Sequence, residues 1–180
     1  MATSYSHAVV GLAIAPLYRP GRRAWLYWTL CAVLPVIPDF DVFSGYAYGS
    51  LWGHRGVTHS LLFALWFAFL IASLTFRVLQ ANLWILTLIF FAAMGSHGLL
   101  DACTRGGGNI PLFWPVNDDW FGNWGPIPVS DMAFELPNPS RSRALRSELL
   151  WVWLPAAIWM AGVLTCRRVS AHKRATAPTP

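Results

Sequence analysis

LWILTLIFFAAMGSHGLLD, residues 83–101, is the stretch of sequence that decides the fold of this chain. Its first part is almost wholly apolar, and the stretch approaches the length of about 20 residues that a transmembrane helix needs. It ends in His97 and Asp101, which are four residues apart and therefore leave the same face of a helix. A lone buried polar residue bonded to a neighbouring helix is common for Ser or Thr, but a His and Asp pair at membrane depth is costly. The stretch predicts a membrane-spanning helix that carries part of a functional site.

The composition of the whole chain indicates an integral membrane protein. Of its 180 residues, 56% are hydrophobic and only 12% are charged, which is too apolar for an ordinary soluble domain. Many of the 11 Trp lie near the ends of apolar runs, where an indole can sit among lipid headgroups. The predicted fold class is all-α, a multi-pass transmembrane helical bundle with a short N-terminal helix. The spans are expected near residues 24–37, 60–76, 83–100 and 149–166.

A single membrane-embedded domain is expected over residues 1–169. Its segment 104–146 is rich in Gly, Pro, Asn and Trp, which predicts an irregular loop at the extracytoplasmic surface. Such a loop can act as a lid over a site or as a platform for substrate. Residues 170–180 are polar and are expected to form a disordered tail, in which His172 has no predicted role.

The positions of Lys and Arg predict the orientation of the spans. If the turn that holds Arg19, Arg22 and Arg23 is cytoplasmic, alternation places Arg77 and the basic tail on the same side. That side then holds eight of the 13 basic residues, and the other side holds five. The clusters of His and Asp in or beside the spans all fall on the second side. The polar site is therefore expected to face away from the cytoplasm.

Two other classes of protein are not supported by the sequence. The net charge of +5 comes from basic residues scattered at segment ends, without the basic stripe and interleaved aromatics of a nucleic-acid binder. Cys31, Cys103 and Cys166 show no CxxC spacing, so neither a disulfide framework nor a thiolate zinc site is indicated. We interpret them as small apolar fillers, although Cys103 is close enough to Asp101 to line the site.

Helical geometry places three of the polar clusters at a similar depth. At 1.5 Å of rise per residue, His7, Asp39 and His97 lie about 17, 21 and 20 Å from the aromatic residue at the inner end of their segments. The hydrocarbon layer is roughly 30 Å thick, so each side chain falls somewhat below its outer boundary. His59 begins its span slightly higher. One recessed polar pocket, built by several segments, would explain them all.

Asp39 and Asp41 follow Pro35 and Pro38, which predicts that the helix ends there and that the chain becomes extended. In an extended chain alternate side chains point the same way, so the two carboxylates would converge. Carboxylates that converge in a poorly solvated place repel each other unless a cation lies between them. The alternative is a solvated loop after the helix, where Asp after Pro is ordinary turn chemistry.

The run HRGVTHS, His54–Ser60, places two histidines and an arginine at the start of an apolar run. Thr58 or Ser60 can cap the following helix and so fix the direction of His59. A spacing of five residues does not put both histidines on one helical face, so the first must reach the site from the loop. Arg55 suits a bidentate contact with a phosphate or a carboxylate. The alternative for Arg55 is a side chain that extends to the lipid headgroups.

These pieces together resemble a known family, the bacterial LexA-regulated, membrane-bound, predicted metal-dependent hydrolases. The matching pieces are His7, LPVIPDFD at 34–41, HRGVTHS at 54–60, HGLLDACT at 97–104 and PLFWP at 111–115. The resemblance covers residues 5–116 and implies a divalent-metal site, hydrolase activity and a place in the inner membrane. The His-x-x-x-Asp helix adds a more distant likeness to zinc-dependent phospholipases C and single-strand nucleases.

The chain departs from that family in the loop that follows this helix. Residues 105–108, RGGG, are richer in glycine than the family pattern leads us to expect. Residues 128–131, PVSD, only loosely match an aspartate motif that occurs late in some members. The role of Asp131 is therefore left open.

The hypothesis that joins these observations is hydrolysis of a phosphoester by a site with one or two divalent ions, zinc by preference or manganese. The substrate would be a lipid or a lipid-linked molecule, because a pocket just below the headgroups can receive a phosphate sideways from the outer leaflet. An amide bond is the alternative target. Asp41 would accept a proton from water, and Arg55 would neutralise phosphate charge. The predicted metal ligands are Asp39, His59, His97 and Asp101, completed by His7 and His54.

Three other functions fit part of the pattern. His59 and His97 could ligate a haem b in an electron-transfer bundle, although the nearby carboxylates count against haem iron. A divalent-cation transporter would also use acids and histidines, but its polar residues should continue to the cytoplasmic side. A non-catalytic member of the family could bind metal for stability or regulate a partner. The oligomeric state stays open.

Overall fold

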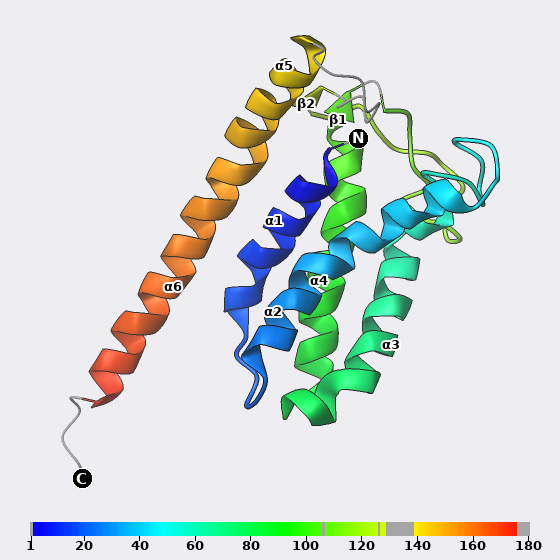
Figure 1. The fold of residues 1–180 in the computed structure, drawn as a ribbon. Coiled ribbons are helices and arrows are strands. Elements are labelled where there is room, and N and C mark those ends of the chain that lie inside the picture. Colours follow the sequence, from blue (N-terminus) through cyan, green and yellow to red (C-terminus); the bar gives the residue numbers. More distant parts are fainter. Residues whose placement is uncertain (1, 106, 126, 129–138, 176–180) are drawn as a thin grey trace.

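The computed structural model describes residues 2–105, 107–125, 127–128 and 139–175, and within these ranges the chain is mostly helical. Four of its helical segments are long and apolar enough to cross a membrane (Figure 1). They are Ala24–Phe43, Leu61–Leu79, Leu83–Ala102 and Ala144–Lys173. The predicted all-α, multi-pass fold is therefore confirmed.

A short helix precedes these spans, as predicted. It consists of α1 (Ser4–Ile14) and a 3₁₀ turn, η1 (Ala15–Leu17). Thr3 caps α1 by accepting a hydrogen bond from the backbone N–H of Ser6. The helix packs on the first and third of the four spans. It is too short to cross the membrane, but it lies against the bundle at the level where the polar residues gather.

The first span differs from the prediction at its outer end. It begins as α2 (Ala24–Val33) and continues as a long 3₁₀ helix, η2 (Leu34–Phe43), so the chain is not extended at Asp39 and Asp41. A 3₁₀ helix has about three residues per turn, which places residues two apart on faces about 120° from each other. The two carboxylates therefore diverge, contrary to the prediction, and contact different neighbours.

The second and third spans match the predicted positions within three residues. A 3₁₀ turn, η3 (Val57–His59), leads into α3 (Leu61–Leu79), and α4 (Leu83–Ala102) returns beside it. Ser60 caps α3 by accepting a hydrogen bond from the Phe63 backbone N–H at 3.1 Å. Of the two candidate caps, Ser60 is thus the one used.

The loop after α4 is irregular over its described residues. It contains one short parallel pair of strands, β1 (Thr104–Arg105) and β2 (Ile127–Pro128). The Leu61 backbone N–H donates to the Leu112 carbonyl at 2.9 Å, which ties the loop to the start of α3. Asp131 lies outside the described residues. The predicted loop 104–146 is too long, because helix α5 (Pro139–Glu148) already occupies its last part.

The last span is part of one continuous helix that is longer than predicted at both ends. After α5 the chain passes through a π-helical turn, η4 (Leu149–Trp153), into α6 (Leu154–Ala175). Residues 170–175, expected to be a disordered tail, are therefore helical, and residues 176–180 lie outside the description. Figure 1 shows this helix standing away from the bundle towards its C-terminal end.

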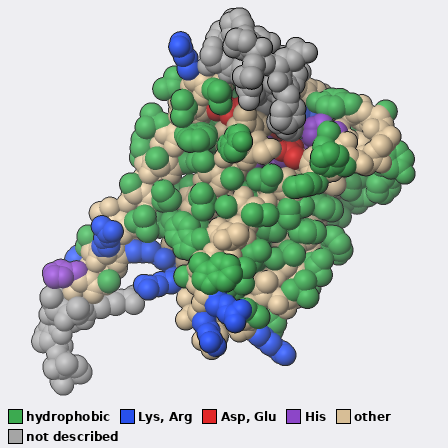
Figure 2. Space-filling view, viewed as in Figure 1, with side chains coloured by type: hydrophobic (Ala, Val, Ile, Leu, Met, Phe, Trp, Pro, Cys, Tyr) green, Lys and Arg blue, Asp and Glu red, His purple; other side chains and the backbone are tan. Residues whose placement is uncertain are grey.

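Charged side chains divide between the two ends of the molecule. In Figure 2, Asp and Glu side chains gather at one end, with histidines among them, and most Lys and Arg side chains lie at the other. Between these ends the bundle packs around an apolar core that includes Tyr27, Leu34, Leu86 and Phe90. The polar residues of the predicted site therefore lie on one side of a hydrophobic layer.

Candidate metal centre

Four of the predicted ligands meet at the outer end of the bundle. They are Asp39 on η2, His59 on η3, and His97 and Asp101 on α4, and all four side chains are buried. One ligand atom from each lies within 4.8 Å of the others. Three separate segments thus bring two imidazoles and two carboxylates to a single point.

The separations between these atoms suit a single ion. His97 Nε2 lies 3.6 Å from Asp39 Oδ1 and 3.8 Å from Asp101 Oδ2. His59 Nε2 lies 3.5 Å from Asp101 Oδ2 and 4.0 Å from Asp39 Oδ1. Four ligands at the usual distance of roughly 2.1 Å around a tetrahedral zinc ion stand about 3.4 Å apart. The residues present fit such an ion with small adjustments.

The converging atoms also lack hydrogen-bond partners, although Asp101 forms an ion pair with Arg55. Asp39 Oδ1, His59 Nε2, His97 Nε2 and both carboxylate oxygens of Asp101 are buried, and none has a hydrogen-bond partner among the described residues. Buried polar atoms without partners are costly, and charged ones more so. Their aim at a common point is what a site for a divalent cation requires.

Outer contacts fix the direction of both histidines. His97 Nδ1 donates a hydrogen bond to the Pro35 carbonyl at 2.7 Å, because a carbonyl can only accept. His59 Nδ1 lies 3.3 Å from Asp41 Oδ2 and 3.1 Å from Thr58 Oγ1. Each ring therefore keeps its proton on Nδ1 and turns the Nε2 lone pair to the centre, as metal-binding histidines do.

His54 and Asp41 form a neighbouring group that shares His59 with the centre. His54 Nδ1 donates to Asp41 Oδ1 at 2.5 Å, and the Thr58 hydroxyl donates to the other oxygen of Asp41. Asp41, His54 and His59 again place one ligand atom each within 4.8 Å. The structure thus brings His54 beside the main cluster, reaching it from the loop, but does not make it one of the four.

His7 also reaches the centre, from α1. Its ring stacks on that of His97 with 3.9 Å between centroids, and its Nε2 lies 3.4 Å from Asp101 Oδ1. Its side chain is fully buried, and neither ring nitrogen has a hydrogen-bond partner among the described residues. His7 was the least distinctive of the predicted ligands because it stands alone in the sequence, and the structure places it against two of the others.

Arg55 points inward, so the alternative of a side chain extended to the headgroups is wrong. It is 0% exposed, and its Nη2 lies 3.2 Å from Asp101 Oδ2. The guanidinium also donates to Thr104 Oγ1 at 3.3 Å and to the Gly108 carbonyl. Arg55 therefore connects one of the four converging side chains to the loop after α4.

Comparison with known proteins identifies the kind of protein that carries this centre. The family model described as YdjM inner membrane protein matches residues 1–171. The chain belongs to the YdjM family. A relative, the inner membrane protein YbcI of Escherichia coli (strain K12), is 36% identical over 177 residues, which cover 93% of this chain and 99% of the relative. No solved structure matches the chain.

Membership of the YdjM family confirms the predicted location. The family and the relative are inner membrane proteins, and the four apolar spans agree with that. The likeness to LexA-regulated hydrolases is a finer statement about regulation and activity, which stays a prediction. This is a membrane protein of the YdjM family with a His and Asp cluster suited to a metal ion.

Several residues that support the cluster in this YdjM protein have no signal in the sequence. The Ser4 hydroxyl donates to Asp39 Oδ2 at 3.3 Å, and Thr104 links Arg55 to the Asp101 backbone carbonyl. Single Ser and Thr residues are so common that the sequence alone does not mark them as supports of a site. Burial raises the pKa of the Cys103 thiol, which keeps it protonated and agrees with its interpretation as a filler.

Proposed function

We propose that this protein is a membrane-embedded, metal-dependent hydrolase that cleaves a phosphoester of a lipid or lipid-linked substrate at the extracytoplasmic face. The observation that carries the proposal is the convergence of buried oxygen and nitrogen atoms without hydrogen-bond partners, from Asp39, His59, His97 and Asp101. A buried polar cluster of this kind in a membrane domain marks a functional site by default. The mixed nitrogen and oxygen donors suit zinc or manganese.

The four residues would hold the ion, with His7 as a further ligand next to Asp101. When bound, a divalent ion supplies Lewis acidity, which makes water a better nucleophile and stabilises charge on a phosphoryl oxygen. The protein's part is to hold the ligands still. The Pro35 carbonyl and Asp41 do this for the two imidazoles of His97 and His59.

The balance of buried charge supports one resident ion. Asp39, Asp41 and Asp101 bring three carboxylates, and among the described side chains Arg55 is the Lys or Arg paired with one of them, Asp101. With neutral imidazoles, two negative charges are left, which a single divalent ion offsets. A second ion would leave the same poorly solvated region with excess positive charge unless an anionic substrate entered with it.

Proton transfer is assigned to Asp41 acting with His54. The two are joined by a short hydrogen bond of 2.5 Å, and their group touches the centre through His59. A carboxylate that holds an imidazole in one tautomer makes it an effective proton acceptor. The sequence alone favours Asp41 as the proton acceptor. Because His54 is hydrogen-bonded to Asp41, we assign His54 to proton transfer as well.

Arg55 is assigned a positioning role in this proposal. Its guanidinium already contacts Asp101, Thr104 and the Gly108 carbonyl, so it has few donors left for a substrate phosphate. It holds Asp101 in place and joins that carboxylate to the loop over the site. Its Nε–H has no hydrogen-bond partner among the described residues and is the donor that a phosphate could meet without displacing these contacts.

A lipid substrate is supported by the surroundings of the cluster. The end of η2 and the loop after it expose Phe40, Phe43, Tyr46, Tyr48 and Trp52. No charged residue lies between Asp41 and Arg55 in this segment. Exposed aromatic side chains without charges are typical of the headgroup region of a membrane. A headgroup phosphate at that level would need little displacement to reach the cluster.

The geometry gives less support to haem binding or to transport. The rings of His59 and His97 lie 4.6 Å apart with two carboxylates against them, which leaves no space for a macrocycle between the imidazoles. Below the cluster the bundle is filled with apolar side chains such as Leu34, Phe90 and Met94. A cation pathway would need polar groups there.

The test is metal analysis of the purified protein with matched variants. Wild type should carry about one equivalent of zinc or manganese, and His97→Ala and Asp101→Ala should lose it. His172→Ala, at the opposite end of the chain, is the control and should keep it. Full metal content in both site variants would remove the metal centre. Metal without phosphate release from any lipid in liposomes would leave a metal-binding protein that is not a hydrolase.

A further inference from the structure

The last helix of the bundle is attached mainly near its two ends. At the outer end, Glu148 accepts hydrogen bonds from the first turn of α1 and its cap, and the Trp153 indole donates to the same turn. At the inner end, Arg167 donates to the carbonyls of Leu17 at 3.1 Å and Tyr18 at 3.5 Å. Helix α6 also contacts α1, and it diverges from the bundle towards its C-terminal end (Figure 1).

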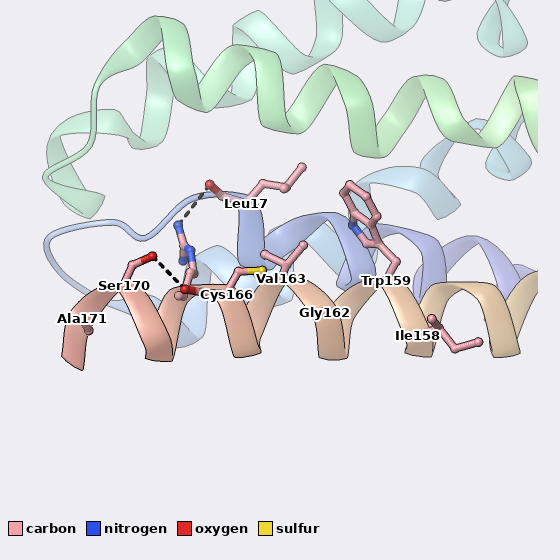
Figure 3. Close-up of a pocket in the computed structure, with 9 residues that line it drawn as sticks. Leu17, Ile158, Trp159, Gly162, Val163, Cys166, Ser170 and Ala171 are labelled. Carbon is pink, nitrogen blue, oxygen red and sulfur yellow. Dashed lines mark hydrogen bonds between the residues drawn. The ribbon is translucent and has the colours of Figure 1, made fainter. Parts of the chain in front are cut away.

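The space between the attachments is an open groove of about 1190 Å³. It is lined by Leu17 on one side and by Trp159, Gly162 and Val163 of α6 on the other (Figure 3). A smaller hollow of about 420 Å³ adjoins it at Arg167, with Trp28 in its wall. Ligand pockets in proteins commonly measure about 300–1,000 Å³, so the groove can take a long apolar group.

The depth of the groove decides what can fill it. Ile158 lies at the outer end of the groove, nine residues before Arg167. Nine residues correspond to a distance of about 14 Å along the helix. If Arg167 lies at the inner headgroups, the groove runs into the inner half of the hydrocarbon layer. Water is not stable against such an apolar lining. We therefore expect an acyl chain of a neighbouring membrane lipid to fill the groove.

The inner end of the groove is strongly basic and has no acidic counterpart in the chain. Arg19, Arg167 and Arg168 line the smaller hollow. The full sequence has no Asp or Glu before Asp39 or after Glu148, and none near Arg77. The cations at this end are therefore not balanced by carboxylates of the same segments. Basic pockets between helices on the cytoplasmic side are typical sites for anionic lipid headgroups.

We propose that the groove between α6 and η1 binds an anionic phospholipid of the inner leaflet. One acyl chain lies along Trp159 and Gly162, and the phosphate lies between Arg19 and Arg168 in the smaller hollow. The lipid fills the space that the two attachments of α6 leave open. This site is separate from the metal centre, which lies at the opposite end of the bundle.

Gly162 provides a variant that blocks the groove without disturbing the fold. A Cβ atom at Gly162 would meet nothing within 4 Å, and Gly162 lines the groove, so Gly162→Leu starts its side chain in open space there. Leucine also favours a helix more than glycine does. Ala161→Leu is the matched control, because Ala161 is exposed on the same helix and lines neither the groove nor the hollow.

The measurement is a titration of delipidated protein in detergent, followed by native mass spectrometry. The probes are phosphatidylglycerol and phosphatidylcholine with the same acyl chains. Wild type should bind the anionic lipid more tightly, and Arg168→Gln should weaken that binding about fivefold with little effect on phosphatidylcholine. Gly162→Leu should weaken it at least about tenfold, whereas Ala161→Leu should match wild type.

Several outcomes would overturn the proposal. Equal affinity for the two lipids in wild type would remove the headgroup site. Equal weakening by Ala161→Leu and Gly162→Leu would show that the groove is not the binding place. A change of oligomeric state in Gly162→Leu without a change in lipid binding would make the groove a contact between two copies of the chain.

Discussion

Replacing Arg55 by methionine tests whether its guanidinium holds Asp101 in place or serves the substrate. Methionine keeps most of the length and the apolar stem but removes the charge and every donor. In the structure Arg55 is fully buried, 3.2 Å from Asp101 Oδ2, with further bonds to Thr104 and the Gly108 carbonyl. The substitution therefore leaves a carboxylate in a poorly solvated place without its paired cation.

The expected loss of stability follows from that buried charge. Removing one partner of a buried ion pair costs about 3–5 kcal/mol, because the other charge is left uncompensated. For a domain of this size, 1 kcal/mol corresponds to about 2–4 °C in Tm, so Arg55→Met should lower Tm by roughly 6–20 °C in chelator. With saturating zinc the loss should be smaller, because a cation bound to Asp101 then offsets the orphan charge.

The assay is thermal unfolding in detergent of wild type, Arg55→Met, Asp101→Asn and the double variant. Each is measured with chelator and with zinc. The double variant should lose less stability than the sum of the singles, by about 0.5–3 kcal/mol, because each single leaves a charge that the double removes. Wild-type Tm for Arg55→Met in chelator, together with a raised KM for a phosphoester, would refute the positioning role and favour a contact with phosphate.

Three further predictions concern the supports of the centre. Asp41→Asn should weaken zinc affinity about 10–100-fold without abolishing it, measured by competition with a chelator, because Asp41 orients a ligand and is not one of the four. Gly98→Ala should lower both Tm and metal content, since its Cβ would lie 2.5 Å from the His59 carbonyl oxygen. Gly95→Ala on the same helix should be tolerated, because its Cβ would be tight only against the end of the Leu61 side chain, at 3.3 Å, and would make ordinary contacts with the Phe91 ring. Glu148→Gln should cost at least about 1.5 kcal/mol in detergent unfolding, because charge-assisted bonds to α1 are weakened; an unchanged Tm would mean that these bonds do not hold the last helix.

Much of the fold follows from the sequence because membrane physics leaves few choices. An apolar run of about 20 residues must be a helix in lipid, so the spans near 60–76 and 83–100 are predicted within three residues of α3 and α4. A polar side chain at that depth is expensive, which singles out His97 and Asp101. Helical rise then brings Asp39 and His7 to the same level, and the structure places both beside that pair.

The division of roles between Asp39 and Asp41 does not follow from the sequence. Pro35 and Pro38 indicate that the α-helix cannot continue, but they permit either an extended chain or a 3₁₀ helix. Only the 3₁₀ helix separates the two carboxylates, so that Asp39 points to the centre and Asp41 contacts His54. The inward direction of Arg55 is hidden for a similar reason, because it depends on a left-handed backbone conformation, φ 71°, in a loop.

The same buried charges connect the proposed function to the fold. Asp39 and Asp101 lie on different spans, and their oxygens are held within reach of the same two imidazoles. Without a cation the carboxylates repel across a poorly solvated gap, and Arg55 offsets only one of them. A bound ion would turn that repulsion into a link between η2, η3 and α4, with α1 joined through His7. In our proposal the ion that supplies the chemistry therefore also fastens the outer end of the bundle, and the stability of the whole protein should depend on it.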